Sequence, residues 1–358
     1  MKISNLVLAV LGSIAGTAQA QSSLTIYGLI DLGLSRMNAG QSTLTFTPLA
    51  LIGRPSALTE RSSTSSRLGF RGSEDLGGGL KASFQLETRF TPDTGGFEPR
   101  DGALTNVLWN AQSWVGLSSG LGEVRLGRQF VPAYYIGLLS DPWTYSYDVG
   151  GASSFTRGGN GVTMAYNAVV YRTPVLAGFS AEVMVAAGEG GAAAVNAPAG
   201  RVGRNEGANV QYSSGPLWVG LAFNNSVQKN TPIENRYANL GIAYDFGFVR
   251  PIVSYSAGND NVAGNPTTRT YFIGATAPLG QGQLKTVAAR YDAAVGQNFN
   301  SVNSALPQLT GGQNTTKFGL GYEYFLSKRT SAHLDLGTAK TDSVSRTSGV
   351  EAGMKHSF

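Results

Sequence analysis

The sequence predicts an all-β fold, an antiparallel transmembrane β-barrel of about sixteen strands. Three observations predict it. Apolar and polar residues alternate along most of the chain, and short and long connections alternate between the resulting segments. In addition, no apolar run after the first twenty residues reaches the ~18 residues that a membrane-spanning helix requires. A sheet in lipid must then close on itself, because an open edge leaves backbone hydrogen-bonding groups without partners.

The first twenty residues contain the three parts of a secretory signal in the expected order. Lys2 supplies a positive charge, Leu6–Ala15 is an apolar stretch, and Ala18-Gln19-Ala20 offers a small-x-small cleavage pattern. We therefore expect residues 1–20 to be a signal peptide that is cleaved after Ala20, and residues 21–358 to form the barrel.

The alternation is clear from the start of the mature chain. Leu24, Ile26 and Ile30 share one parity and Tyr27 and Asp31 the other, which is the pattern of a strand with one apolar face. About sixteen segments follow this pattern. They are 23–35, 64–75, 79–92, 106–118, 122–130, 160–173, 177–188, 205–213, 216–227, 235–246, 248–257, 267–278, 282–294, 315–327, 330–341 and 348–358.

The connections differ in length in a regular way. Short ones hold turn residues, as at Ser214-Gly215. Long ones are polar or glycine-rich, and they occupy 36–63, 131–159, 189–204 and 295–314. An even number of strands with short turns at one rim and long loops at the other is typical of outer-membrane barrels. Sixteen strands also enclose more space than side chains fill, so we expect a water-filled interior.

A soluble β-sandwich or solenoid would show the same alternation. It does not explain aromatic residues near the segment ends, which suit the aromatic girdles at a membrane interface. These are Trp114, Tyr171, Tyr244, Tyr324 and Phe358. The terminal Phe358 ends a segment that we expect to pair with the first strand and close the barrel.

Composition narrows the possible functions. The chain has no cysteine and two histidines, so disulfides, thiolate metal sites and histidine-rich metal sites are excluded. The formal charge of +5 is small and spread along the chain, which gives nucleic-acid binding little support. We expect no metal ion and no cofactor.

Several stretches, in chain order, resemble the Gram-negative trimeric general diffusion porins of the betaproteobacterial type. They are Ser23–Asp31, Ser66–Leu80, Trp114–Leu117, Gly122–Gln129, Gly321–Thr330 and the terminal Phe358. The resemblance implies a sixteen-stranded barrel in the outer membrane, reached by secretion through the inner membrane. It also implies a homotrimer, contact with outer-membrane lipid and lipopolysaccharide, and passive diffusion of small hydrophilic solutes and inorganic ions. Small outward residues such as Gly28 and Gly116 would allow close packing of the protomers.

By the same resemblance, the third external loop, 131–159, folds into the barrel and narrows the channel. It carries the acids Asp141 and Asp148 together with the aromatic residues Tyr134, Tyr135, Trp143, Tyr145 and Tyr147. We expect the aromatic rings to pack the loop inside the barrel and the carboxylates to face basic groups across the gap. The residues alone leave a surface loop with solvated acids as the alternative.

Strand parity selects basic residues for the facing wall, because their apolar neighbours point outward. The candidates are Arg67, Arg71, Lys81, Arg89, Arg125 and Arg172. We expect Arg67 at the constriction, whereas Arg71, Lys81 and Arg172 lie nearer strand ends and suit a rim equally well. Ala111 and Val170 stand where similar porins often carry arginine. We therefore expect a weak anion preference or none.

Three alternatives stay open. One is a substrate-specific channel. Another is a barrel hydrolase with His333 and Asp335 on one strand face, although no serine motif accompanies this pair. The third is adhesion through the long loops 36–63 and 295–314, which does not exclude pore function. Loop 36–63 also holds an apolar stretch, 44–56, which could contact a neighbouring protomer or remain a soluble loop.

Overall fold

The computed structural model describes residues 22–38, 58–98, 107–146, 148–153, 162–188, 203–227, 234–260, 267–292 and 314–358. The expected signal peptide and the apolar stretch 44–56 lie outside these residues. The strands are β1 (Ser23–Met37), β2 (Leu58–Arg61), β3 (Ser66–Gly77), β4 (Leu80–Phe90), β5 (Gln112–Ser119), β6 (Gly122–Phe130), β7 (Met164–Arg172), β8 (Phe179–Ala186), β9 (Asn205–Ser214), β10 (Leu217–Val227), β11 (Glu234–Tyr244), β12 (Arg250–Asp260), β13 (Thr267–Leu279), β14 (Gly282–Asp292), β15 (Thr315–Phe325), β16 (Thr330–Thr341) and β17 (Thr347–Ser357). Helix α2 spans Pro132–Leu139. In the part of the chain that the structure describes, no helix is long and apolar enough to cross a membrane.

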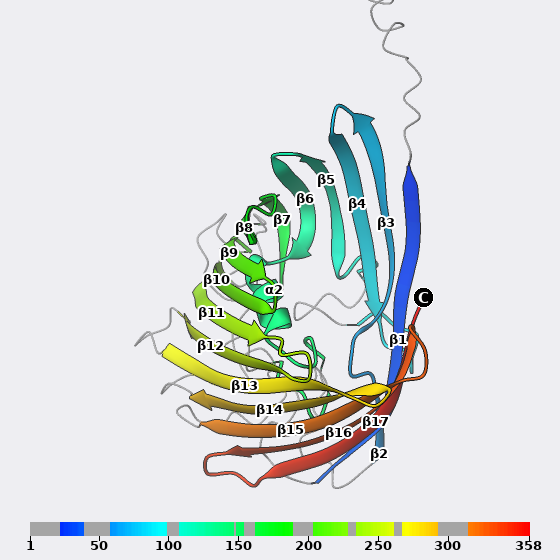
Figure 1. The fold of residues 1–358 in the computed structure, drawn as a ribbon, viewed down its shortest axis with the longest axis vertical. Helices are drawn as coiled ribbons and strands as arrows, with labels where there is room; N and C mark the ends of the chain where they lie inside the picture. Colours follow the sequence, from blue (N-terminus) through cyan, green and yellow to red (C-terminus); the bar gives the residue numbers. More distant parts are fainter. Residues whose placement is uncertain are drawn as a thin grey trace, which may run out of the picture.

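The strands form one closed antiparallel sheet, which curves around an interior in Figure 1. Consecutive strands from β3 to β17 pair with each other, and β1 then closes the ring. Along residues 29–37, β1 pairs with β17, and on its other edge it pairs with β3 and with the short β2. Because β2 and β3 share that edge, they are two pieces of one interrupted strand. The seventeen strands therefore make a sixteen-stranded barrel, and the predicted fold class is confirmed.

Each expected segment overlaps one observed strand, and the largest difference is at the start of β5. The expected segment begins at residue 106, whereas β5 begins at Gln112. Just before it, the Asn110 side chain accepts a hydrogen bond from Arg89 N at 2.7 Å and donates one to Arg89 O at 2.9 Å. A side chain thus replaces the neighbouring strand's backbone at this position. The backbone hydrogen bonds between β4 and β5 therefore begin only after Asn110.

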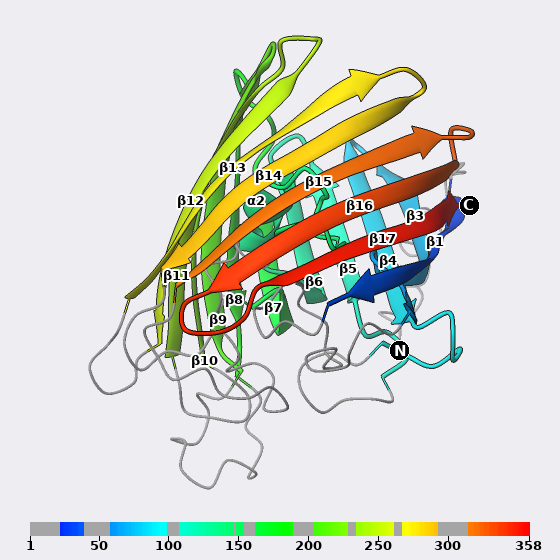
Figure 2. The same ribbon diagram turned by 90° about the horizontal axis from the view of Figure 1, so that it is seen from below.

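The two faces of the sheet have opposite chemistry. On β1, Leu24 is 66% exposed whereas Asp31 is fully buried. On β11, Ile242 and Tyr244 are exposed and Asn239 is buried. An apolar surface of this extent is unfavourable in water and suits contact with acyl chains. Figure 2 shows strands β11 to β17 as a row of tilted strands across the wall that carries this surface.

The short connections depend on glycine where the backbone turns. Residues Gly77, Gly78 and Gly79 join β3 to β4 with φ angles of +82°, +62° and +80°. Residues with a Cβ rarely adopt these angles, so glycine permits a turn of this tightness.

Two residues expected on the outer face of β5 lie on its inner face. Val115 and Leu117 are the exposed residues of this strand, so Trp114 and Gly116 point inward. Trp114 is 8% exposed, and the Arg125 guanidinium lies 4.1 Å from its ring centroid. The aromatic character of Trp114 suggested the membrane girdle, but strand parity and a cation–π partner place it inside.

Candidate functional site

The connection between β6 and β7 contacts the inner face of the barrel wall. We call its described residues, 131–146 and 148–153, the β6–β7 segment. Proline at the first position of α2 suits a helix start, because the amide hydrogen that it lacks has no partner there. Asn209 Nδ2 of β9 donates to Pro132 O at 2.8 Å, and Asn239 Nδ2 of β11 donates to Ala133 O at 3.3 Å. Figure 1 shows α2 on the concave side of the sheet.

Glycines on the wall leave room for this helix. A Cβ at Gly220 of β10 would lie 2.7 Å from Ile136 Cδ1, and one at Gly241 of β11 would overlap Ser140 Oγ. Ile136 is fully buried in this contact. The helix therefore approaches β9 to β11 more closely than a wall of larger side chains would allow.

The tyrosines of the segment form an aromatic cluster beside the helix. Tyr134 stacks on Phe130 with ring centroids 4.1 Å apart and an interplanar angle of 8°. Tyr135 meets Phe130 edge-on at 6.4 Å, and Tyr145 lies 4.9 Å from Tyr134. Offset and edge-on ring pairs of this kind add to the stabilisation that burial gives. These contacts tie the first half of α2, and the turn that follows the helix, to the end of β6.

Simple alternation fails at Phe130, because β6 contains a bulge. Val124 and Leu126 are exposed outward, which would place Phe130 outward as well. The register with β7 shifts between Gly127 and Gln129, and Phe130 is only 5% exposed. A glycine inside a strand, here with φ +131°, is the available sequence signal for such a bulge.

The far end of the segment lies against β15, β16 and β17. Trp143 Nε1 donates to Asp335 Oδ1 at 2.7 Å, and Val149 N donates to Glu351 Oε2 at 3.1 Å. Lys317 Nζ donates to Gly151 O. The segment therefore bridges two parts of the wall, β9 to β11 at one end and β15 to β17 at the other.

Two paired glycines accommodate the backbone of the segment at this end. Gly319 of β15 and Gly337 of β16 are register partners on the inner face. A Cβ at Gly319 would overlap Gly150 O, and a Cβ at Gly337 would overlap Val149 O. Both positions thus require the absence of a side chain for the observed contact.

The two carboxylates of the segment have different surroundings. Asp141 accepts hydrogen bonds from Trp143 N at 3.0 Å and Tyr145 N at 3.1 Å, so it holds the turn that follows α2. Burial raises the pKa of Asp141 to about 6, although these two amides act in the opposite direction. The Asp141 carboxylate therefore serves the loop's own conformation.

Asp148 is buried against the wall. Its Oδ2 lies 3.8 Å from Lys355 Nζ of β17, and its Oδ1 lies 3.8 Å from His333 Nε2 of β16. Burial alone would raise the pKa of Asp148, but the charges of Lys355, His333 and Lys285 outweigh it and lower the pKa. Among the described residues, the basic partner of Asp148 is Lys355, which the sequence argument did not select.

The six basic candidates lie on strands β3, β4, β6 and β7, and we call them the basic wall. Arg67 and Arg89 are register partners, and Arg67 Nε donates to Ser65 O at 3.2 Å. Arg71 and Lys81 are exposed. The structure thus gathers the candidates on one side of the barrel, away from the wall that holds Asp148.

In the described part of the chain, carboxylates lie beside Arg89, Arg125 and Arg172. The closest N–O distances are 3.1 Å for Arg89 and Glu87, 2.8 Å for Arg125 and Glu123, and 2.6 Å for Arg172 and Glu182. Four guanidiniums also lie 4.1–5.5 Å from aromatic ring centroids: Arg71 over Tyr27, Arg89 over Phe130, Arg125 over Trp114 and Arg172 over Tyr135. These contacts orient the guanidiniums, while the carboxylates cancel part of their charge.

Apolar packing occupies the two positions where arginine was expected from the resemblance. Ala111 is fully buried and packs with Phe130, while Val170 is 1% exposed and packs with the residues around α2. These two positions of the wall therefore belong to apolar clusters that include residues of the β6–β7 segment, and they carry no charge.

Sequence reasoning did not select a second group of charged residues on the inner face as site residues. Strand parity is the signal that places them there, as it does for Asp31. They are Asp31, Lys285, Lys317, Glu323, Glu351 and Lys355. Lys285 Nζ pairs with Glu323 Oε2 at 2.6 Å, and Glu351 lies 3.6 Å from Arg61.

The C-terminal residue pairs with the first strand. Gly28 N donates to Phe358 O at 3.0 Å, and Phe358 N donates to Gly28 O at 3.1 Å. A Cβ at Gly28 would overlap the Phe358 ring. The space over Gly28 is therefore filled within the chain, and this differs from the expected role of Gly28 in contact between protomers.

A closed barrel with an apolar outer face and a charged inner face is a membrane channel protein of the outer-membrane type. The comparisons identify the family. The sequence profile of the Gram-negative porins matches residues 7–343. The chain therefore belongs to the Gram-negative porin family. Membership of this family defines a passive outer-membrane diffusion channel rather than an enzyme.

Individual relatives agree with this assignment. The chain is 31% identical to outer membrane porin protein 32 of Delftia acidovorans and 31% identical to an outer membrane porin protein of Bordetella pertussis, in each case over the full length of both chains. The structure resembles an anion-selective porin from Comamonas acidovorans with a TM-score of 0.75 and 28% identity, over 94% of this chain and 100% of that one. A trimer form of OmpT from Vibrio cholerae shares the fold at 14% identity, with a TM-score of 0.64 over 94% of this chain and 99% of that one.

Proposed function

We propose that the β6–β7 segment is the constriction of this channel and that solutes pass between it and the part of the basic wall on β3 and β4. The observation that carries the proposal is the pair of anchor regions, on β9 to β11 and on β15 to β17. A segment held at both ends against two separate parts of the inner face reduces the open cross-section. Small hydrophilic solutes and inorganic ions then pass down their concentration gradients.

The charges at this position support a weak preference for anions. The basic wall has six cationic side chains, and among the described residues Arg89, Arg125 and Arg172 have close carboxylate partners. The carboxylates of the segment act elsewhere, Asp141 in its own turn and Asp148 beside Lys355. An excess of positive charge therefore remains beside the path, but it is partly neutralised, and a partly neutralised wall selects ions weakly.

Planar-bilayer recording of the purified protein tests this proposal. In a potassium chloride gradient, we expect a reversal potential that shows a small preference for chloride or none. A strong preference for potassium would contradict the charge assignment. Saturable block by one solute would favour the alternative of a substrate-specific channel.

We further propose that the protein is a homotrimer surrounded by outer-membrane lipid and lipopolysaccharide, exported by a signal peptide at 1–20. The trimer form of the structurally similar OmpT and the exposed apolar face support this assembly. Conductance that increases in groups of three equal steps would support it. The mass of the mature chain should place its N-terminus at Gln21.

A further inference from the structure

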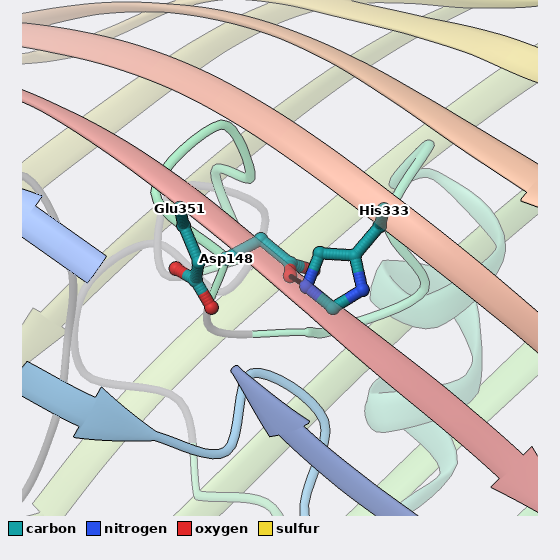
Figure 3. Close-up of side chains that lie close together, drawn as sticks. All are labelled: Asp148, His333 and Glu351. Atoms are coloured by element: carbon teal, nitrogen blue, oxygen red, sulfur yellow. Dashed lines mark ion pairs between the residues drawn. The ribbon is translucent and has the colours of Figure 1, made fainter. Parts of the chain in front are cut away.

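Three side chains with metal-binding chemistry converge where the β6–β7 segment meets the wall. Asp148 comes from the segment, His333 from β16 and Glu351 from β17 (Figure 3). One potential ligand atom of each lies within 4.8 Å of the other two. We propose that these residues bind a divalent transition-metal ion of the zinc type, and that the ion fastens the segment to the wall.

Two of the three side chains are buried with polar atoms that lack hydrogen bonds. The side chains of His333 and Asp148 are 2% and 0% exposed. Among the described residues, neither ring nitrogen of His333 has a hydrogen-bond partner. The Asp148 carboxylate also lacks a well-formed hydrogen bond, although Lys355 Nζ lies 3.8 Å from its Oδ2 and Ser63 interacts with it. Buried polar atoms are normally satisfied, so each unsatisfied group requires an explanation. A metal ion bound between these two side chains would give a partner to one nitrogen of His333 and one oxygen of Asp148.

The distances suit coordination better than direct contact. His333 Nε2 and Asp148 Oδ1 are 3.8 Å apart, which is too far for a hydrogen bond. In a tetrahedral zinc site with bonds of ~2.0–2.1 Å, neighbouring ligand atoms lie ~3.3 Å apart. If the two side chains moved slightly closer together, both atoms could therefore bind one zinc ion.

Glu351 is already oriented as a third ligand. Its Oε2 accepts a hydrogen bond from Val149 N at 3.1 Å, and its Oε1 accepts one from Ser63 Oγ. A carboxylate oxygen has a second lone pair, so these bonds leave capacity for a metal ion. Hydrogen bonds of this kind commonly hold metal ligands in position. Asp335 Oδ2, 4.0 Å from His333 Nε2, is a further carboxylate oxygen beside these three residues.

The surrounding charge favours a cation. Among the described residues, six carboxylates and four cationic side chains interact here, which leaves a formal excess of two negative charges if His333 is neutral. They are Asp31, Asp141, Asp148, Glu323, Asp335 and Glu351, with Arg61, Lys285, Lys317 and Lys355. One imidazole with two carboxylates is a donor set that zinc accepts, whereas Mg²⁺ and Ca²⁺ prefer oxygen ligands alone.

Zinc binding to the full-length mature protein in detergent, measured by isothermal titration calorimetry, tests the site. We expect one zinc ion per chain, with an affinity at least tenfold weaker in His333→Gln. The matched control is His356→Gln, because His356 is the only other histidine and lies on the outer face of β17, where its Nδ1 is 2.9 Å from Thr330 Oγ1. Any of three results would overturn the proposal: equal binding by wild type and both variants, binding lost only in His356→Gln, or no stoichiometric binding.

A second measurement needs no substitution and guards against misfolding of the variant. Co²⁺ added to the wild-type protein should produce visible absorption bands of a nitrogen- and oxygen-ligated ion, and Zn²⁺ should remove them. Absence of these bands would overturn the proposal. Both tests measure binding rather than conductance. A protein that conducts normally but binds neither metal would therefore refute the metal site and leave the proposed channel function intact.

Discussion

Replacing Gly337 by valine should release the β6–β7 segment from β16 and change the conductance. A Cβ at this position would overlap Val149 O and lie 2.8 Å from the Val149 carbonyl carbon. Backbone atoms cannot rotate away as a side chain can, so the segment or the strand must move. Overpacking of this kind typically costs about 1–3 kcal/mol.

The hydrogen bond that holds the segment at this position contributes a free energy similar in size to that cost. Val149 N donates to the Glu351 carboxylate at 3.1 Å, and a hydrogen bond to a charged group contributes ~1.5–3 kcal/mol. A change of ~1–3 kcal/mol in the free energy of this contact changes the ratio of molecules with the segment bound to the wall to those with it displaced by ~5–150-fold. We therefore expect Gly337→Val to show additional conductance levels above that of the wild type.

Single-channel recording in planar bilayers measures this effect, with resistance to heat on gels as the check that the barrel is folded. Gly120→Val is the matched control, because Gly120 lies in the short turn between β5 and β6 and a Cβ there would meet no atom within 4 Å. It should conduct like the wild type. If folded Gly337→Val also has the conductance and the noise of the wild type, the segment does not set the width of the channel, and the reasoning is refuted.

Three further outcomes are expected. Arg125→Gln leaves Glu123 without the guanidinium that lies 2.8 Å away, so the reversal potential in a salt gradient should move toward cation preference; Arg236→Gln, at an exposed arginine, should leave it unchanged. The pKa of Asp141 is raised from 3.8 to about 6 in the folded protein, so the folded state binds its proton more tightly, and stability from this group should rise as pH falls from about 6 to about 4. Melting curves over this range should show that rise, and Asp141→Asn should remove it; an equal rise in the variant would assign it to another group. Phe358→Ala should destabilise the barrel by roughly 2 kcal/mol, about half the cost of truncating a fully buried phenylalanine, because the ring is 44% exposed; an unchanged unfolding midpoint in urea would contradict the assigned contact with β1.

The β6–β7 segment and the wall together fill part of the interior, and glycine decides where they meet. Gly319 and Gly337 accommodate the segment on one side, and Gly220 and Gly241 accommodate it on the other. Ordinary alternation would place a side chain at each of these inner positions. Their small size therefore determines the path of the segment, whereas the charged residues beside them hold it.

The sequence by itself determined the strands and their faces, because contact with lipid on one side and water on the other imposes a period of two that is visible locally. Local bulges and side-chain interactions limited this reasoning, as at Phe130 and Trp114. Only the tertiary structure decided which groups meet inside the barrel. Trp143 bonds to Asp335 across 192 positions of the chain, and Val149 bonds to Glu351 across 202. Closure of the sheet creates these neighbours, and no periodicity along the chain records which inner positions a loop will contact.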